Sequence, residues 1–199
     1  MLYTADAARA APDTVMRSMF EARKQVFIDL LKWDLPVLAG RFEVDQFDGP
    51  RPRYLIITDQ AQRHLASARL LPSTRPHILG TLFPGLCEEA LPSGPDTYEI
   101  TRFCLGRGLG AQRRRQVRDT LVLALAEHAL ETGIRVYTGV AEPAWLQQIL
   151  AFGWACRPLG PPRSIGGRIL GALRIDIAPD TRTLLAQAGI GADAQAEAA

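Results

Sequence analysis

Long hydrophobic runs, a secretion signal and a strong charge imbalance are all missing from this sequence, and each absence removes a class of protein. No apolar run approaches the roughly 20 residues that a membrane-spanning helix needs. The N-terminus has no basic region followed by an apolar core. The formal net charge is only +2, too small by itself to argue for nucleic acid or an anionic membrane. We therefore expect a cytoplasmic protein with no membrane and no nucleic-acid partner.

The sequence has only three cysteines, and they stand far apart at Cys87, Cys104 and Cys156. They form no CxxC pair, and none of the three histidines lies at a zinc-ligand interval beside them. Such a scattered, odd-numbered set is typical of buried, reduced thiols in a cytosolic protein. We expect neither disulfides nor a metal centre.

What the sequence does contain is enough apolar material for one compact domain. Of its 199 residues, 47% are hydrophobic and 22% are charged, which excludes a disordered chain and allows a substantial core. With no internal repeat and no linker, we expect a single domain over residues 1–188. Residues 189–199 are rich in alanine and glycine and are predicted to form a flexible tail.

The order of the expected elements indicates an α/β fold. A first helix is expected from about Pro12 and should end near Pro36. Residues 71–97 hold five prolines and should lack long regular elements. The other expected elements are strands 54–58, 64–70, 97–105, 135–140 and 170–177 and helices 111–132 and 143–152. This order fits a mixed sheet with helices on its faces.

A dense set of charged and aromatic residues lies between positions 23 and 102. Its members are Arg23, Phe27, Trp33, Asp45, Asp48, Arg69, Glu99 and Arg102. Such charges usually form exposed ion pairs worth about 0–1 kcal/mol each, so spacing alone leaves both surface pairs and a polar ligand site open. Glu99 and Arg102 are three apart and would face opposite sides of a regular strand. A bulge or a strand end would be needed to change that.

A run of arginines without any acid follows the expected strand 97–105 and enters the next helix. It comprises Arg107, Arg113, Arg114, Arg115 and Arg118. Cations in a first helical turn oppose the helix dipole, at a cost of about 0.3–1 kcal/mol per charge, and a broken local rule hints at function. Arginines and backbone N–H groups at a helix start would hold a phosphate well. A solvated basic face is the equally weighted alternative.

Several sequence blocks resemble the acyl-homoserine lactone synthases, the autoinducer synthases of bacterial quorum sensing. Residues 23–27 (RKQVF) and Trp33 are similar to that family's first-helix signature, and residues 42–48 (FEVDQFD) to its acidic segment. Residues 67–79 (SARLLPSTRPHIL) reproduce its longest motif, and residues 98–104 (YEITRFC) close the set. The blocks stand in the family's order and at its spacing, which is far more specific than a lone glycine motif.

The resemblance implies a fold and a reaction. The fold would be GNAT-like, a single-domain three-layer αβα sandwich with a mixed central sheet. In the reaction, the amine of S-adenosylmethionine attacks an acyl thioester to form an amide. The methionine carboxylate then displaces the sulfonium, closing the lactone and releasing 5′-methylthioadenosine. S-adenosylmethionine is a substrate, and no cofactor or metal is needed. The acyl donor would be acylated acyl carrier protein or acyl-coenzyme A.

The resemblance also implies a catalytic set. Glu99 matches the family's proposed general base, which must take a proton from the attacking amine. Arg102 would provide a cation for the substrate carboxylate. Arg69 would hold the acidic network in place, while Asp45 and Asp48 would order the arginines or meet the cationic parts of the substrate.

Other matched positions would contact the substrates. Arg23 would join in binding the carboxylate of S-adenosylmethionine. Phe27 and Trp33 would present their faces to the adenine or the sulfonium, where a cation–π contact contributes about 0.5–2 kcal/mol. Backbone N–H groups near Phe103 would stabilise the oxyanion. Thr138 matches an acyl-pocket position where threonine accompanies 3-oxo chains, although a β-branched residue also simply suits a strand.

The arginine run would then meet the acyl donor, either the phosphopantetheine and acidic surface of the carrier protein or the phosphates of coenzyme A. Two other interpretations stay open. Another GNAT-type enzyme would move an acetyl group from acetyl-coenzyme A to an amine and ignore S-adenosylmethionine. A nucleic-acid-binding module would use the arginine run, with an affinity that falls steeply with salt.

Overall fold

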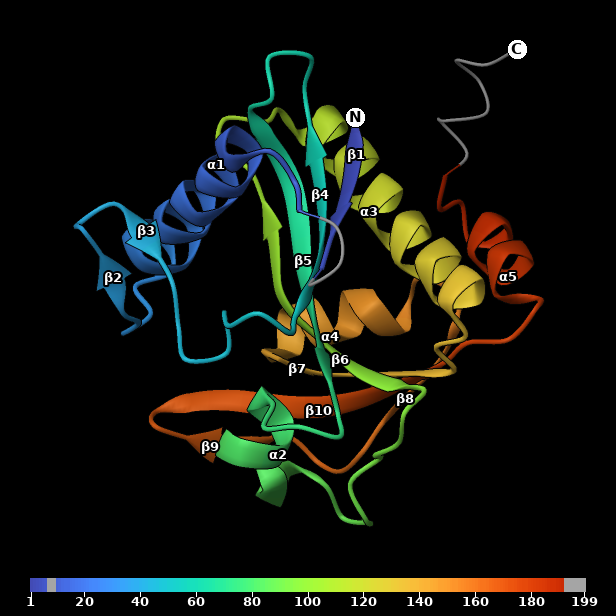
Figure 1. The fold of residues 1–199 in the computed structure, drawn as a ribbon. Coiled ribbons are helices and arrows are strands. Elements are labelled where there is room, and N and C mark those ends of the chain that lie inside the picture. The colour runs from blue at the N-terminus through green and yellow to red at the C-terminus, as the bar shows by residue number, and fades with distance from the viewer. Residues whose placement is uncertain (7–9, 192–199) are drawn as a thin grey trace. The chain divides into compact units, whose positions relative to one another are not determined.

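The computed structural model describes residues 1–6 and 10–191, and the chain divides into two compact units (Figure 1). The first unit comprises Met1–Leu70 and Arg102–Leu121, and the second comprises Leu71–Thr101 and the chain from Val122 onward. Strand β6 (Thr97–Leu105) and helix α3 (Ala111–Thr132) each contribute residues to both units, because the unit boundaries fall inside them. Of the tail expected at 189–199, only residues 189–191 lie within the described part, so that expectation stays a prediction.

The first unit is built on antiparallel strands. Besides the parts of β6 and α3 that it holds, its elements are β1 (Leu2–Ala5), α1 (Asp13–Arg23), η1 (Lys24–Leu30), β2 (Val37–Leu38), β3 (Phe42–Glu43), β4 (Arg53–Thr58) and β5 (His64–Pro72). Strand β4 lies between β1 and β5, with Leu55 opposite Thr4 on one side and Ala68 on the other (Figure 1). The N–H of Gly106 donates to the Leu65 carbonyl at 2.8 Å, which ties the end of β6 to the start of β5.

Helix α1 packs through the apolar positions that its sequence repeats every four residues. Val15 and Met19 are buried and form one core cluster with Tyr54 and Ile56 of β4. Residues four apart share a helix face, so this pair fixes which side of α1 meets the sheet. The opposite end of the same helix delivers Arg23 to the interior.

The second half of the first helix is wound as a π-helix, η1. The N–H of Leu31 donates to the carbonyl of Val26, five residues back, at 2.9 Å. We predicted one continuous helix ending near Pro36; instead α1 is followed by wider turns that end at Leu30. Such π-helical turns are rare in proteins, and those that occur are often found at functional sites.

Strands β2 and β3 form a separate two-stranded hairpin. Residues 39–41 connect them, and the N–H of Arg41 donates to the Leu38 carbonyl at 3.1 Å. Ala39 and Gly40, the central residues of this turn, have φ of 51° and 67°, and positive φ at both positions matches the right-handed twist of hairpin strands. This short hairpin carries Glu43, which is completely buried.

The second unit contains the parallel pair that makes the sheet mixed. Its elements are the start of β6 and the end of α3, with α2 (Ile78–Leu82), η2 (Pro84–Leu86), β7 (Val136–Ala141), α4 (Pro143–Leu150), β8 (Ala155–Pro158), β9 (Arg163–Ile165), β10 (Arg168–Asp176) and α5 (Thr181–Gln187). Strand β7 runs parallel to β6 and antiparallel to β10. A parallel connection needs a long crossover, which α3 supplies. The predicted α/β fold with a mixed sheet is confirmed.

The apolar core of the second unit lies under α2 and η2. Leu79 and Leu86 from these two short helices pack with Leu159 and with Ala172 of β10. All four side chains are buried. Within the described residues, no helix combines the length and the apolar character that crossing a bilayer requires.

Candidate active site

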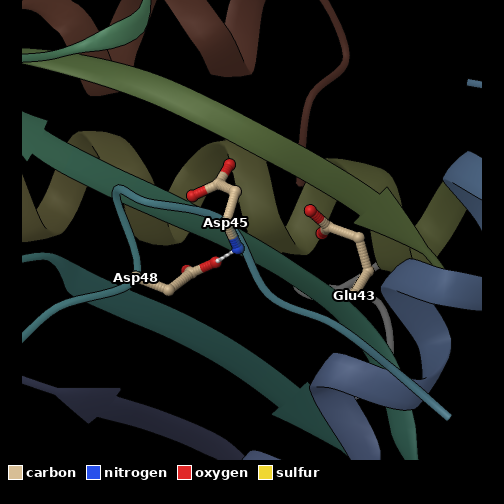
Figure 2. Close-up of side chains that lie close together, drawn as sticks. All are labelled: Glu43, Asp45 and Asp48. Atoms are coloured by element: carbon tan, nitrogen blue, oxygen red, sulfur yellow. Dashed lines mark hydrogen bonds between the residues drawn. The ribbon is translucent and has the colours of Figure 1, made fainter. Parts of the chain in front are cut away.

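Three carboxylates gather on one short segment of the first unit. Figure 2 shows Glu43 on β3 and Asp45 and Asp48 in the turn that follows it. The N–H of Asp45 donates to Oδ2 of Asp48 at 2.9 Å, and the N–H of Phe47 donates to Oδ1 of Asp45 at 2.8 Å. Aspartates hydrogen-bond their own local backbone in this way in tight turns. The turn therefore orients both carboxylates before any cation is considered.

Arg23, the last residue of α1, is the first cation of this cluster. Its Nε donates to Glu43 at 2.5 Å, and its Nη1 and Nη2 donate to the two oxygens of Asp48 at 2.8 and 2.7 Å. The Arg23–Asp48 contact is the bidentate geometry that arginine forms best. The Arg23 side chain is only 1% exposed. The hydroxyl of Tyr54 also donates to Asp48, at 2.8 Å.

Arg69 and Arg102 complete the cluster from two other strands. Arg69, on β5, donates to both oxygens of Asp45 at 2.6 and 3.0 Å and lies 2.7 Å from Asp48. Arg102, on β6, donates from Nε and Nη2 to Glu43 and from Nη2 to Asp45 at 2.7 Å. Three guanidinium groups thus face three carboxylates, and the cluster as a whole is electrically neutral.

Burial and pairing act in opposite directions on these groups, and pairing prevails. Burial alone would raise the pKa of Asp48, but the hydrogen bond and charge of Arg23, with the charge of Arg69, hold that pKa well below its usual range. Burial would lower the pKa of Arg23, yet Asp48 and Glu43 raise it. Burial, together with Asp48, raises the pKa of Tyr54. Asp48 is therefore ionised and the Tyr54 hydroxyl is neutral at physiological pH.

The same three carboxylates, Glu43, Asp45 and Asp48, are close enough together to be considered as metal ligands, with ligand atoms within 4.8 Å of one another. Each, however, is already bonded to at least one buried guanidinium. A divalent cation would have to displace those arginines or sit beside them in a buried, electrically neutral cluster. These residues therefore do not fit a metal site.

Two aromatic rings lie beside the charged cluster. Phe27 of η1 stacks on Trp33, with ring centroids 4.9 Å apart and planes inclined by 21°. The guanidinium of Arg102 lies over the Phe27 ring at 5.6 Å. In addition, the N–H of Trp33 donates to the Phe27 carbonyl at 2.8 Å. The π-helix and its end thus form a small aromatic wall next to Arg102.

The backbone at Arg102 departs from regular strand geometry within β6. Its φ is +49°, in the left-handed region that a bulky residue rarely adopts. Such a conformation costs about 1–3 kcal/mol and persists only where the surroundings impose it. Here the bonds to Glu43 and Asp45 hold the side chain in place. The sequence left open whether the strand is regular between Glu99 and Arg102, and the structure has an irregular backbone at Arg102.

Glu99 and Thr138 lie side by side in the second unit. They are register partners across the parallel pair β6–β7, and both are buried. The N–H groups of Ile78 and Leu79, in the first turn of α2, donate to Oε2 and Oε1 of Glu99 at 2.7 and 2.9 Å. Within the described residues, the buried hydroxyl of Thr138 has no hydrogen-bond partner.

The arginine run lies at the start of α3 in the first unit, and it is open to solvent. Arg107, Arg113, Arg114 and Arg115 are exposed, and Arg118 is half-buried. Arg114 reaches back to the Gly106 carbonyl at 3.4 Å, while Arg118 pairs with Asp119. Arg114 therefore contacts the glycine turn at the head of this helix.

The structure brings most of the predicted charged residues together and adds two. Arg23, Asp45, Asp48, Arg69 and Arg102 form one contact network in the first unit, with Phe27 and Trp33 against it. Phe103 follows Arg102 on β6. Sequence reasoning missed Glu43 and Tyr54. Glu43 lies inside the quoted FEVDQFD block, so its position in that motif was the signal available.

Comparison with known proteins gives consistent relatives. Residues 9–185 match the family model described as "Autoinducer synthase". The acyl-homoserine-lactone synthase of Ralstonia nicotianae is 33% identical over 176 residues, covering 85% of this chain and 86% of that protein. The solved structure of the CoA-dependent acyl-homoserine lactone synthase BjaI, with SAM and isopentyl-CoA, matches with a TM-score of 0.84 and 28% identity, covering 96% of this chain and 90% of BjaI.

A more distant structure shows the fold alone. An acyl-CoA N-acyltransferase from Pseudomonas aeruginosa matches with a TM-score of 0.61 at 14% identity, covering 88% of this chain and 99% of that chain. The GNAT-like architecture expected from the sequence is confirmed by these likenesses.

Proposed function

This chain belongs to the autoinducer synthase family and is an acyl-homoserine-lactone synthase, and on that premise we propose how its residues divide the work. The enzyme transfers an acyl group from a thioester to the amine of S-adenosylmethionine and then closes the lactone, releasing 5′-methylthioadenosine. The observation that carries the assignment of roles is the neutral Arg–carboxylate cluster around Asp48. Within it, Arg23 directs Nε, Nη1 and Nη2 at protein carboxylates, whereas Arg102 uses only Nε and Nη2.

Arg102 is the cation for the substrate carboxylate. Its Nε and Nη2 are bonded to Glu43 and Asp45, while its Nη1 has no partner among the described residues. Arg23 instead directs Nε, Nη1 and Nη2 at protein carboxylates. A charge-assisted bond to a carboxylate contributes about 1.5–3 kcal/mol. Arg23, with Arg69, Asp45 and Asp48, acts by holding Arg102 and the turn in place.

Phe27 and Trp33 form the aromatic surface for the sulfonium or adenine. The stacked pair stands beside Arg102, so a substrate carboxylate on Nη1 would place the rest of the molecule near these rings. The electron-rich ring faces attract a cation by about 0.5–2 kcal/mol. The break at Arg102 supports a role for the adjacent Phe103 backbone in stabilising the oxyanion.

Glu99 is the general base. The N–H groups of Ile78 and Leu79 donate to its two oxygens and so orient the carboxylate. It would take the proton of the substrate amine directly or through a bridging water. Thr138, directly across from Glu99, supplies a buried hydroxyl that could hydrogen-bond an oxygen on the acyl chain.

The acyl donor binds through its phosphates at the head of α3. Arg107, Arg113, Arg114 and Arg115 are exposed there, and a helix N-terminus adds favourable backbone N–H groups. Acylated acyl carrier protein offers both a phosphopantetheine and an acidic surface to this patch. Acyl-coenzyme A offers a phosphopantetheine and further phosphates but no acidic protein surface, and BjaI is described as CoA-dependent.

No cofactor or metal takes part in this proposal, because every carboxylate of the candidate cation site is committed to an arginine. We place the enzyme in the cytoplasm. Cys87, Cys104 and Cys156 are free thiols, as is usual for a reducing compartment.

One experiment tests the activity and the donor together. The purified protein is incubated with S-adenosylmethionine and a panel of acyl carrier protein and coenzyme A thioesters, and the products are identified by mass spectrometry. We expect an acyl-homoserine lactone and 5′-methylthioadenosine in equal amounts with at least one donor. Absence of both products across the whole panel would refute the activity.

A further inference from the structure

His77 is a buried histidine to which neither the reaction nor the sequence analysis assigns a role. It stands immediately before α2 and is 4% exposed. Its Nδ1 lies 2.7 Å from the carbonyl oxygen of Arg75. A carbonyl can only accept, so Nδ1 carries the proton. The other nitrogen, Nε2, is buried with no hydrogen-bond partner among the described residues.

The far side of the His77 ring rests on Gly80. A Cβ added at Gly80 would lie 2.7 Å from Cε1 and 2.8 Å from Nε2 of His77, closer than real Cβ atoms approach. The absence of a side chain at Gly80 is thus what makes room for the imidazole. Fixed by a hydrogen bond on one side and by the helix backbone on the other, the ring has a single position.

The His77 ring lies next to the first turn of α2, which binds the Glu99 carboxylate. The two residues that follow His77 are Ile78 and Leu79, whose N–H groups bind the two oxygens of the Glu99 carboxylate. Helix α2 has only five residues, and helices this short are not stable by their own hydrogen bonds. The direction of those two N–H groups must therefore come from tertiary contacts, and the His77 clamp is the contact next to them.

We propose that His77 is a positioning residue for the general base: clamped between the Arg75 carbonyl and Gly80, it fixes the first turn of α2 and thereby holds the Glu99 carboxylate in one orientation. This inference rests on the proposed role of Glu99. It assigns to His77 no contact with substrate and no proton transfer. Misplacing a reacting group by about 1 Å can cost about 100-fold in rate, so the effect belongs in kcat.

Three substitutions of His77 separate positioning from bulk stability. His77→Asn keeps an N–H donor close to the place of Nδ1, whereas His77→Gln moves its amide outward and His77→Ala removes it. We expect kcat for lactone formation to fall about 10–100-fold in the Gln and Ala variants and to stay within about threefold in the Asn variant. The KM for S-adenosylmethionine should change little in all three, because the arginine cluster is untouched.

Gly80→Ala provides an independent route to the same displacement. Its methyl group would push the His77 ring away, so we expect a loss of kcat similar to that of His77→Gln. In the double variant with His77→Ala the ring is gone, and the added methyl meets only the end of the Leu91 side chain, at 3.0 Å. Its kcat should then be no lower than that of His77→Ala alone, a non-additive result typical of residues in direct contact.

Circular dichroism gives the midpoint temperature of thermal unfolding for every variant. The kcat of each variant is then measured well below the lowest of these temperatures. Lower midpoints with kcat unchanged in His77→Gln and His77→Ala would overturn the proposal, and so would equal losses of kcat in the Asn and Gln variants. Glu99→Gln separates the two hypotheses. If Glu99→Gln is inactive while His77→Gln is normal, only the positioning role fails; if Glu99→Gln is fully active, the base assignment fails.

Discussion

Arg23 and Arg102 differ in how many of their N–H groups the protein uses, and this difference predicts opposite phenotypes. Arg102→Gln should raise the KM for S-adenosylmethionine about 10–100-fold, because a charged hydrogen bond contributes about 1.5–3 kcal/mol. Arg23→Gln should instead reduce the free energy of unfolding by about 3–5 kcal/mol, because Asp48 would lose its bidentate partner and the buried cluster would keep one uncompensated negative charge. Steady-state kinetics and urea unfolding of both variants measure the two effects.

Arg69→Gln is the matched control for Arg23→Gln, because the Arg69 guanidinium also contacts carboxylates of the cluster, those of Asp45 and Asp48. It should behave like Arg23→Gln. A large rise in KM at normal stability for Arg23→Gln would contradict the assignment of the substrate carboxylate to Arg102.

His64 gives a prediction at acid pH. Burial lowers its pKa from 6.5 to about 4, while Nε2 lies 2.9 Å from the Ser67 hydroxyl. Because the folded pKa is the lower one, its contribution to stability is fully present above pH 6.5 and is lost as the pH falls to about 4. His64→Gln has no such titration. The unfolding free energy of His64→Gln minus that of wild type should therefore increase by on the order of 2 kcal/mol as the pH falls from about 7.5 to about 4.5.

Urea unfolding at the two pH values, with both proteins in the same buffers, measures this difference. Asp48 titrates in both proteins and therefore cancels. A difference between His64→Gln and wild type that does not change with pH would show that His64 is not kept neutral by burial.

Sequence patterns identified the charged residues but not their arrangement. The positions of Arg23, Asp48 and Arg102 were predictable because they fall in recognisable blocks. Glu43 was quoted in such a block without a role, since nothing in a one-dimensional pattern shows that one carboxylate accepts from two arginines. The sequence also left surface ion pairs open as an interpretation. Burial excludes that interpretation for this pair, because the Arg23 and Glu43 side chains are 1% and 0% exposed.

At the scale of elements, η1 determines how Phe27 meets Trp33, and this predicts a spectroscopic signal. If S-adenosylmethionine binds beside the stacked pair, its cationic sulfonium should change the fluorescence of Trp33. Titration of the wild-type protein should then show a saturable fluorescence change that is lost in Trp33→Phe. Trp145→Phe is the control, because Trp145 packs on Phe152 in the second unit. A signal retained in Trp33→Phe and lost in Trp145→Phe would argue against the aromatic role of Trp33.

The long elements were predictable and the short ones were not. Strand β6 and helix α3 fall on the predicted bounds, because each has a long periodic pattern between turn residues. Strands β1 and β8 have four residues each and were missed, since so few residues carry no periodicity. The π-helix was missed for another reason. Its apolar residues are spaced much as in an α-helix, and only the backbone hydrogen bonds distinguish the two.

At the scale of the whole molecule, the charge is nearly balanced while the arginines of α3 are concentrated at one site. The double variant Arg113→Glu with Arg115→Glu should lower kcat/KM for an acidic acyl carrier protein donor at least about 10-fold, with a smaller effect on a short acyl-pantetheine. Raising the ionic strength should reduce the wild-type rate with the carrier protein towards that of the variant. Initial rates over a salt series measure both effects.

The double variant Arg157→Glu with Arg163→Glu, at two exposed arginines elsewhere, makes a control of equal charge change. An equal loss of rate in that control would attribute the effect to net charge and not to the head of α3.

The neutral cluster of three arginines and three carboxylates also limits how this enzyme can change over generations. Removing one partner leaves a buried charge, whereas replacing a whole buried ion pair by well-packed apolar residues is often neutral. Single substitutions at these six positions are therefore expected to be rarely accepted, because most of them would give a protein that folds poorly. Strong epistasis is expected: variants that are lethal alone should become viable in matched pairs, such as Arg69→Met combined with Asp45→Leu for folding. We therefore expect the six residues of the cluster to change together and not singly.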